Sequence, residues 1–106
     1  MTIQWTRGGN AGGTFLLGEI DVSYDRLVRL FGEPDPGSSD GKIDAEWVLT
    51  FPPQSTGVVR IRPSEEVIAT IYNGADGTPV AEIRDWHIGG KRREALWLLE
   101  ELISQQ

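Results

Sequence analysis

The segment from Lys42 to Phe51, KIDAEWVLTF, alternates apolar and mostly polar side chains without a break. Its apolar set consists of Ile43, Ala45, Trp47, Leu49 and Phe51. A period of two places this set on one face of a half-buried β-strand. Several of these residues are β-branched or aromatic and pack well on a pleated surface. The segment therefore predicts the strand around which the rest of the chain is arranged.

Length and charge limit the classes of protein to which this chain can belong. It has 106 residues, which suits one domain with one core. It has no cysteine and one histidine, which excludes disulfides, thiolate metal sites and clusters of histidines. Its net charge of −6 disfavours non-specific binding to nucleic acid or to an anionic membrane. The sequence shows no apolar leader and no stretch that could span a bilayer, so we expect a soluble intracellular protein.

The remaining segments predict further strands and two helices. Ser23 is an N-cap for a helix over 24–31, which Gly32 and Pro34 end. A second helix is predicted over 91–104, with a buried stripe of Ala95, Leu98, Leu99 and Leu102. Strands are predicted over 14–22, 67–73 and 78–88, with a short one over 57–62 and a bulge or late start near residues 84 and 85. Short loops, such as 35–41 and 74–77, favour an α+β fold: an antiparallel β-sheet of four to five strands with two helices packed on one face.

The glycine-rich start of the chain predicts a boundary. We expect residues 1–13 to form a flexible N-terminal arm, in which Ile3 and Trp5 could make a short strand, and residues 14–106 to form a single α+β domain. The arm contains four glycines, but it lacks the Walker lysine and the Rossmann spacing. A linker or hairpin loop is therefore favoured over a phosphate-binding loop.

Trp97 is the first candidate functional residue. On a helical wheel it lies nearly opposite the buried stripe of the second helix, among charged residues that include Glu94 and Glu101. Interfaces are enriched in tryptophan, so Trp97, Glu94 and Glu101 form a candidate partner-binding site. Trp97 is also a candidate contact for a homodimer. The alternative is that the N-terminal arm, through Trp5, covers Trp97.

The start of the second helix is the second candidate site. Three cations would lie in its first turn, where the helix dipole disfavours each by roughly 0.3–1 kcal/mol. A phosphate or carboxylate docked on the free N–H groups would reverse that cost. The alternative is a solvated basic patch that pairs with Glu94 or an acidic loop. The candidate anion-binding residues are Gly89, Gly90, Lys91, Arg92 and Arg93.

Catalytic and metal-binding patterns are weak in this sequence. His87 has Asp85 two residues away on the same strand face, but a catalytic histidine also needs a nucleophile or a water site. The pattern G-x-S-x-G occurs once, at residues 37–41, but it lies in a polar loop that leads into a strand rather than in a turn from a strand into a helix, and the chain has no cysteine to act as a nucleophile. A histidine that is hydrogen-bonded within the fold is the favoured interpretation. We therefore expect no catalytic residues, no metal, no cofactor and no enzymatic activity.

An ordered set of short motifs carries a family resemblance over roughly residues 20 to 100. The motifs are YDRL at 24–27, FGEP at 31–34, DGK at 40–42, DAEW at 44–47, ATIYN at 69–73 and WHIGG at 86–90. Together they resemble a group of small bacteriophage proteins, especially from phages of actinobacteria, to which no catalytic residues are assigned. The resemblance implies a phage-encoded origin and a working site in the cytoplasm of a bacterial host.

Three function hypotheses follow. The leading one is a non-enzymatic phage accessory protein that binds a host protein, such as an anti-defence inhibitor of the anti-CRISPR kind; it rests on the resemblance, the acidic charge and Trp97. The competing hypothesis is a small-ligand binder that sequesters a nucleotide-like anion at Gly89–Arg93. A third is a minor virion component. None of the three predicts contact with a membrane.

Overall fold

The fold is a six-stranded antiparallel sheet with two helices, as seen in a computed structural model that describes residues 2–36, 43–58, 61, 63–74 and 76–105. The elements, in chain order, are β1 (Thr6–Arg7), β2 (Phe15–Asp21), α1 (Tyr24–Phe31), β3 (Asp35–Pro36), β4 (Ala45–Phe51), β5 (Val67–Tyr72), the 3₁₀ turn η1 (Val80–Glu82), β6 (Asp85–Gly90) and α2 (Arg93–Ser104). The strand order is β1-β4-β5-β6-β2, and β3 also pairs with β4. The predicted α+β class is confirmed.

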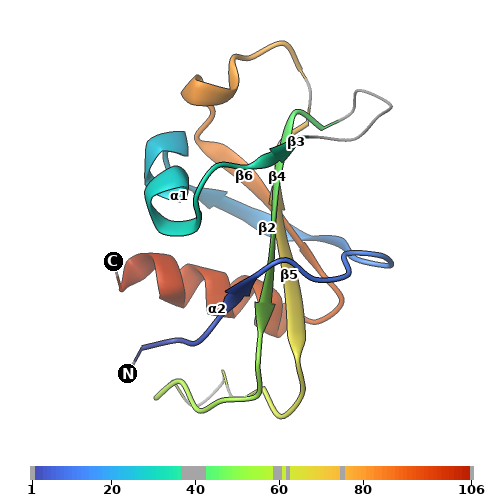
Figure 1. The fold of residues 1–106 in the computed structure, drawn as a ribbon, viewed down its shortest axis with the longest axis vertical. Helices are drawn as coiled ribbons and strands as arrows, with labels where there is room; N and C mark the ends of the chain where they lie inside the picture. The colour runs from blue at the N-terminus through green and yellow to red at the C-terminus, as the bar shows by residue number, and fades with distance from the viewer. Residues whose placement is uncertain (1, 37–42, 59–60, 62, 75, 106) are drawn as a thin grey trace.

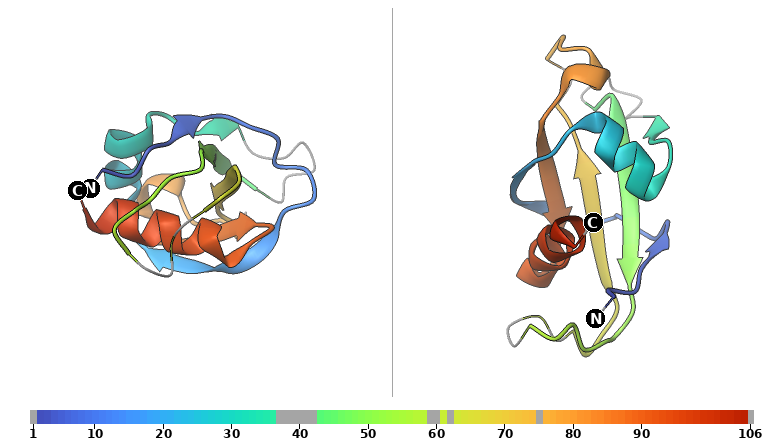
Figure 2. Two further views of the ribbon diagram at one scale, coloured as in Figure 1. Left: turned by 90° about the horizontal axis from the view of Figure 1, so that it is seen from below. Right: turned by 90° about the vertical axis from the view of Figure 1, so that its left-hand side faces the viewer.

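Both helices lie on the same side of the sheet (Figures 1 and 2). The second helix, α2, packs on β6, β5 and β2. In α1, the ring of Tyr24 packs on the indoles of Trp47 and Trp86, with centroids 6.1 and 6.4 Å away. Among the described residues, neither helix is long and apolar enough to cross a membrane.

The core lies between the helices and the face of the sheet that the alternation in β4 predicts. Trp47, Leu49 and Phe51 are fully buried, whereas Glu46 and Thr50, on the opposite face, are half-buried. Because β4 and β5 pair in register, Ile71 lies beside Trp47 and Ala69 lies beside Leu49 on this face. The helices contribute Leu27, Phe31, Leu98, Leu99 and Leu102 to the same cluster.

The first helix begins and ends where the sequence predicts. The hydroxyl of Ser23 accepts a hydrogen bond of 3.2 Å from the N–H of Arg26, as an N-cap does. Gly32 follows the last turn with φ +85°, a conformation that favours glycine. These local signals therefore set both ends of α1.

The first residues of the chain are not the separate arm that the glycines predict. Ile3 is buried in the core, at 1% exposure, and β1 pairs with the edge of β4. Beyond β1 the chain crosses the helix-free face of the sheet, where the N–H of Gly8 donates to the carbonyl of Val48 and the hydroxyl of Thr50 donates to the carbonyl of Gly8. The boundary predicted after residue 13 therefore does not separate an arm from the domain.

Three other predicted segments differ in the structure. The strand predicted over 78–88 begins late, as the broken alternation suggested, because the η1 turn precedes it; it runs from Asp85 to Gly90. In the segment 57–62, the described residues Gly57, Val58 and Ile61 belong to no strand, and the others lie outside the described residues. The predicted loop 35–41 opens with β3, and its remainder also lies outside the described residues.

Candidate functional site

The strand β2 lies at one edge of the sheet. Among the described residues, β2 pairs with β6 and with no other strand. The N–H of Val22 donates to the carbonyl of Arg84, which places that pair in a hydrogen-bonded position of the ladder. By the alternation of an antiparallel ladder, the N–H and C=O groups of Glu19 and Asp21 point away from β6. They are therefore oriented to pair with a strand outside the sheet.

At the opposite edge of the sheet, β4 is covered by other strands. Two short strands, β1 and β3, lie end to end along β4, with Thr6 beside Thr50 and Asp35 beside Glu46. Each has two residues, so neither offers a long template for further pairing. With seven residues, β2 is the longest strand at an edge.

Apolar side chains are exposed at the start of β2. Among the large hydrophobic residues in the described part of the chain, Phe15 and Leu16 are exposed, at 58% and 55%. The pairing with β6 shifts register between Leu16 and Gly18, which marks a bulge at this end of the strand. An exposed apolar pair on an edge strand is typical of a protein-binding surface or of a site that favours aggregation.

A groove runs beside the second half of β2, between this strand and α2. We call it the β2–α2 groove; it has a volume of about 340 Å³ and is lined by residues 19–22, Glu100, Ile103 and Ser104. In Figure 2 (left) the strand and the helix run side by side. The groove is closed toward the start of β2, where Leu96 of α2 lies so near Gly18 that a Cβ there would meet it at 3.1 Å. It opens beside the edge groups of Glu19 and Asp21.

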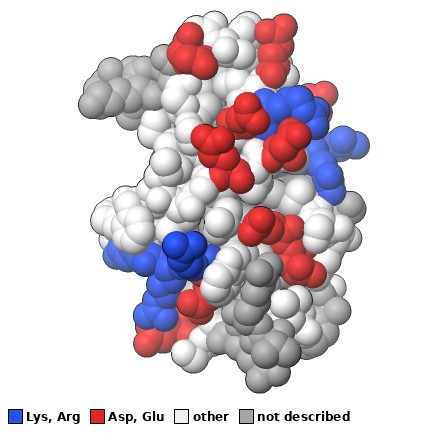
Figure 3. Space-filling model, turned by 180° about the vertical axis from the view of Figure 1, so that it is seen from behind, with Lys and Arg blue, Asp and Glu red and all other residues white. Residues whose placement is uncertain are grey.

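A second depression lies on the other face of the sheet, at the same end of β2. We call it the acidic hollow; it also measures about 340 Å³, and Glu19, Asp76 and Asp85 supply three carboxylates to its wall. The N–H of Thr78 donates to Asp76 and holds the pKa of that carboxyl below its usual value, so Asp76 is ionised at neutral pH. Figure 3, which shows the molecule from behind, has its charged side chains in clusters with uncharged surface between them.

The carboxylates of Asp21 and Glu19 each lie close to a basic side chain of a neighbouring segment. Asp21 accepts from the guanidinium of Arg84 at 3.2 Å, and both side chains are well exposed. Glu19 lies 3.3 Å from Nδ1 of His87, although the two atoms do not meet the geometry of a hydrogen bond. Exposed pairs of this kind contribute little to stability, so the carboxylates are available to another cation.

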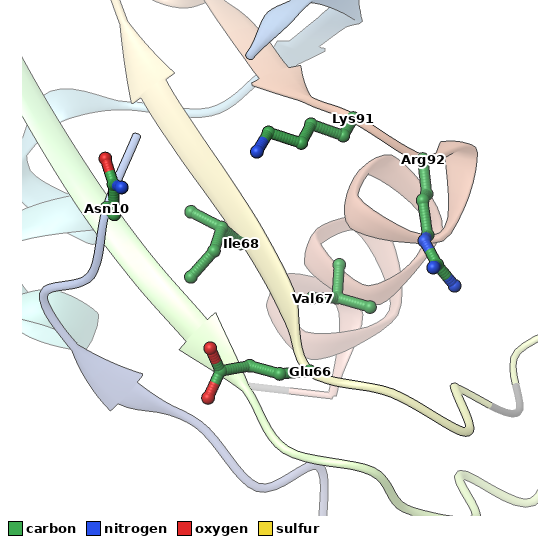
Figure 4. A pocket seen from close by; sticks show the side chains of 6 residues that line it. All are labelled: Asn10, Glu66, Val67, Ile68, Lys91 and Arg92. Atoms are coloured by element: carbon green, nitrogen blue, oxygen red, sulfur yellow. The ribbon is translucent and has the colours of Figure 1, made fainter. Parts of the chain in front are cut away.

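The predicted anion site at Gly89–Arg93 is not assembled as expected. Gly89 and Gly90 are buried residues of β6, and α2 begins at Arg93, so Lys91 and Arg92 precede the helix. Figure 4 shows Lys91 pointing toward Asn10 and Arg92 pointing away from it. Arg92 is paired with Glu65. Both cations line one pocket, together with Asn10 and Glu66, but they point in different directions and Arg92 already has a carboxylate partner.

The predicted site around Trp97 is less exposed than its helical phase suggests. Trp97 is partly buried and packs against the hydrophobic core, and Glu94 and Glu101 are also partly buried. Trp5, the proposed cover, packs on Phe31, with ring centroids 5.0 Å apart in an edge-to-face arrangement. Trp97 keeps some exposed surface, but Phe15 and Leu16 present more of theirs.

His87 lies in a row of polar side chains that crosses the helix-free face of the sheet. Its ring is 5.4 Å from that of Tyr72, which is paired across the strands with Glu46. Burial and the charge of Asp35 raise the pKa of Glu46, and burial and the charge of Glu46 raise the pKa of Tyr72. In the part of the chain that the structure describes, no three His, Asp or Glu side chains are arranged to hold a metal. Among the described residues, no hydrogen bond joins Nδ1 of His87 to a nucleophilic side chain.

The edge of β2 was missed as a site by sequence reasoning. One signal was present: Phe15, Leu16 and Leu17 are consecutive apolar residues, so both faces of the strand carry one. A strand that is apolar on both faces is either buried on both or exposes one of them. Its position at the edge depends on strand order, which no local pattern gives.

No protein-family model matches this chain, and no curated protein or solved structure matches it either. Inferences about function therefore start from the geometry of the site.

Proposed function

We propose that this protein is a non-enzymatic accessory protein that acts by binding another protein through the outer edge of β2. The observation that carries the proposal is a seven-residue edge strand whose outer side pairs with no described strand and whose first two residues, Phe15 and Leu16, are more than half exposed. Edge strands that remain open and apolar recruit other chains. A partner bound along β2 would cover this edge and prevent its unspecific pairing with other chains.

The identity of the partner follows from the family resemblance in the sequence. The ordered motifs from YDRL to WHIGG resemble those of small bacteriophage proteins, so the partner is a protein of the bacterial host, met in its cytoplasm. A component of a host defence system, blocked by this protein, is the leading candidate. This part of the proposal rests on the resemblance, and the binding surface rests on the geometry.

Capture of host proteins with matched variants tests the proposal. The protein is immobilised and exposed to host lysate, and captured proteins are identified by mass spectrometry. The double variant Phe15→Ser with Leu16→Ser should weaken capture of the partner by about 2 kcal/mol or more, the scale of an interface hot spot. The control is Asp25→Ser with Arg29→Ser, which changes two exposed residues of α1 without changing the net charge.

Trp97→Ala separates the two candidate surfaces. Loss of capture with this variant at an unchanged melting temperature, together with full capture by the Phe15/Leu16 variant, would move the interface to α2. Equal capture by wild type and by the Phe15/Leu16 variant contradicts the proposed surface. A wild type that captures no host protein above the level of a bare matrix contradicts the binding function itself.

A further inference from the structure

We infer that the partner contributes an extended strand in which basic and apolar side chains alternate, and that this strand adds to β2 beside α2. The inference rests on the proposed function and specifies the chemistry of its partner. It follows from three features at one end of β2: the outward backbone groups, the β2–α2 groove and the acidic hollow.

The backbone of β2 sets the conformation of the occupant. Glu19 and Asp21 direct N–H and C=O groups outward, two residues apart, which is the repeat at which a neighbouring strand forms hydrogen bonds. A helix or a compact loop cannot satisfy donors and acceptors at that repeat. An extended segment can, because strand addition supplies its affinity through main-chain hydrogen bonds.

The helix side of this strand selects apolar side chains. Along the groove, Ile20 is half-buried, and Val22 and Ile103 are 3% and 8% exposed. Side chains of the added strand that point to this side would cover Ile20 and the outer surface of α2. These apolar residues along the groove favour aliphatic side chains at every second position of the added strand.

The opposite side of the strand selects cations. Alternation places Glu19 and Asp21 on the helix-free face, and Asp85 lies beside Asp21 across the strands. Side chains of the added strand on this face would lie opposite or diagonal to these carboxylates, where opposite charges attract. Lysine or arginine could also reach the acidic hollow, in which Asp76 adds a further negative charge. The two faces together specify alternation of basic and apolar residues.

A second copy of this chain is a poorer occupant of the same edge. Pairing of two β2 strands would bring the Glu19 and Asp21 carboxylates of both copies onto one short interface. Like charges in neighbouring strands are destabilising, and each copy carries a net charge of −6. Charge complementarity therefore favours a basic strand from another protein.

Synthetic heptapeptides with blocked ends test the inference on the intact protein. The probe is KVKVKVK, and the control KKVVVKK has the same composition and charge without the alternation. Affinity is measured by fluorescence anisotropy, and backbone amide NMR shifts locate the bound peptide. We expect the alternating peptide to bind about tenfold more tightly than the control, with shifts along β2 and the second half of α2. Equal affinities would show attraction to an acidic protein rather than strand addition, and would overturn the inference.

Variants of β2 make the test specific. Glu19→Lys with Asp21→Lys should reverse the preference, so that EVEVEVE binds and KVKVKVK does not. Asp25→Lys with Glu33→Lys makes the same change in net charge on exposed residues of another surface and should leave the preference unchanged. If the reversed variant fails to fold, Glu19→Gln with Asp21→Asn should still weaken binding of KVKVKVK. Unchanged binding in that neutral variant would overturn the inference.

Asp21→Pro tests the backbone part of the inference. It removes one outward N–H without removing a hydrogen bond to β6, and it should weaken the alternating peptide more than Asp21→Asn does. Sedimentation of the wild type gives the oligomeric state. A dimer that Asp21→Pro dissociates would show that a second copy occupies the edge, which contradicts the inference.

The outcomes distinguish the inference from the proposed function. If the peptides fail to bind but the Phe15/Leu16 variant still loses its host partner, the protein binds its partner by another mode and only the inference fails. If the alternating peptide binds as expected but no host protein is captured, the strand chemistry stands and the proposed function fails.

Discussion

Nη1 of Arg7 donates a hydrogen bond of 2.6 Å to the carbonyl oxygen of Phe31, the last residue of α1. Nη2 of the same side chain donates to the carbonyl of Glu33 at 2.8 Å, and Nε1 of Trp47 donates to the carbonyl of Gly32 at 2.9 Å. The last carbonyls of a helix lack partners within it and carry partial negative charge. A cation on β1 and an indole on β4 thus satisfy the end of α1 and attach the start of the chain to it.

Removal of the Arg7 guanidinium should therefore destabilise the fold. We expect Arg7→Met to lower the free energy of unfolding by about 2 kcal/mol, because hydrogen bonds from charged donors contribute roughly 1.5–3 kcal/mol. Urea denaturation measures the change. Arg29→Met, in the last turn of α1 but exposed, is the matched control and should cost about 0.5 kcal/mol. Equal losses of stability in the two variants would mean that the hydrogen bonds of Arg7 stabilise the fold no more than an exposed charge near the end of α1 does.

Trp47 should be among the residues whose truncation costs most. Its side chain is fully buried, and its ring packs edge-to-face on that of Trp86, with centroids 5.3 Å apart. Trp47→Ala should lower the free energy of unfolding by roughly 3–5 kcal/mol, through a cavity and the loss of the bond to Gly32. Trp47→Phe keeps an aromatic ring and should cost less. A melting temperature of Trp47→Ala within a few degrees of the wild type would contradict the observed burial.

The strand β4 and the helix α1 could be predicted from sequence because local and tertiary signals agree there. The alternation through Trp47 matches the face that the helices cover, and Ser23 and Gly32 mark the ends of α1 through short-range contacts. The role of Ile3 could not be predicted in this way. Its burial depends on β1 pairing with residues more than forty positions later in the chain.

The candidate sites were harder to predict because they depend on packing between distant segments. Gly89 and Gly90 resemble the residues before a helix, but they belong to β6, where neighbouring side chains leave no room for a Cβ. The helical phase of Trp97 points away from the main stripe, yet the residue packs against the core. Phe15 and Leu16 form a site only because β2 lies at the edge of the sheet, and strand order is a property of the whole chain.

The packing at Gly90 can be tested by adding one methyl group. A Cβ at this position would lie 2.7 Å from Cβ of Ala95 and 3.0 Å from Cδ1 of Leu17, which α2 and β2 hold in place. We expect Gly90→Ala to cost roughly 1–3 kcal/mol, as overpacking of a core does. At Gly74 nothing lies within 4 Å of the added Cβ, so Gly74→Ala is the control and should leave stability nearly unchanged. Urea denaturation of both variants decides whether Gly90 is needed for packing; a stable Gly90→Ala would show that it is not.

Glu46 should make the stability of the protein depend on pH. Burial, and then the nearby charge of Asp35, raises the pKa of Glu46 in the folded state above its ordinary value. In the interval between the ordinary and the raised pKa, the folded state binds more protons than the unfolded state, so this residue lowers stability as pH rises. The penalty is absent below the ordinary glutamate pKa and complete above the raised one. Glu46→Gln cannot ionise and should therefore lack this loss.

Urea denaturation of wild type and Glu46→Gln from about pH 4 to about pH 8 measures the difference. The variant should gain stability relative to the wild type as pH rises through that interval, and the gain should then level off. Glu82→Gln, at an exposed position of η1, is the control and should follow the wild type at every pH. A gain of the same size in both variants would attribute the effect to net charge rather than to the surroundings of Glu46. A wild type that becomes more stable relative to Glu46→Gln as pH rises would reverse the predicted sign and show that the fold favours the charged carboxylate.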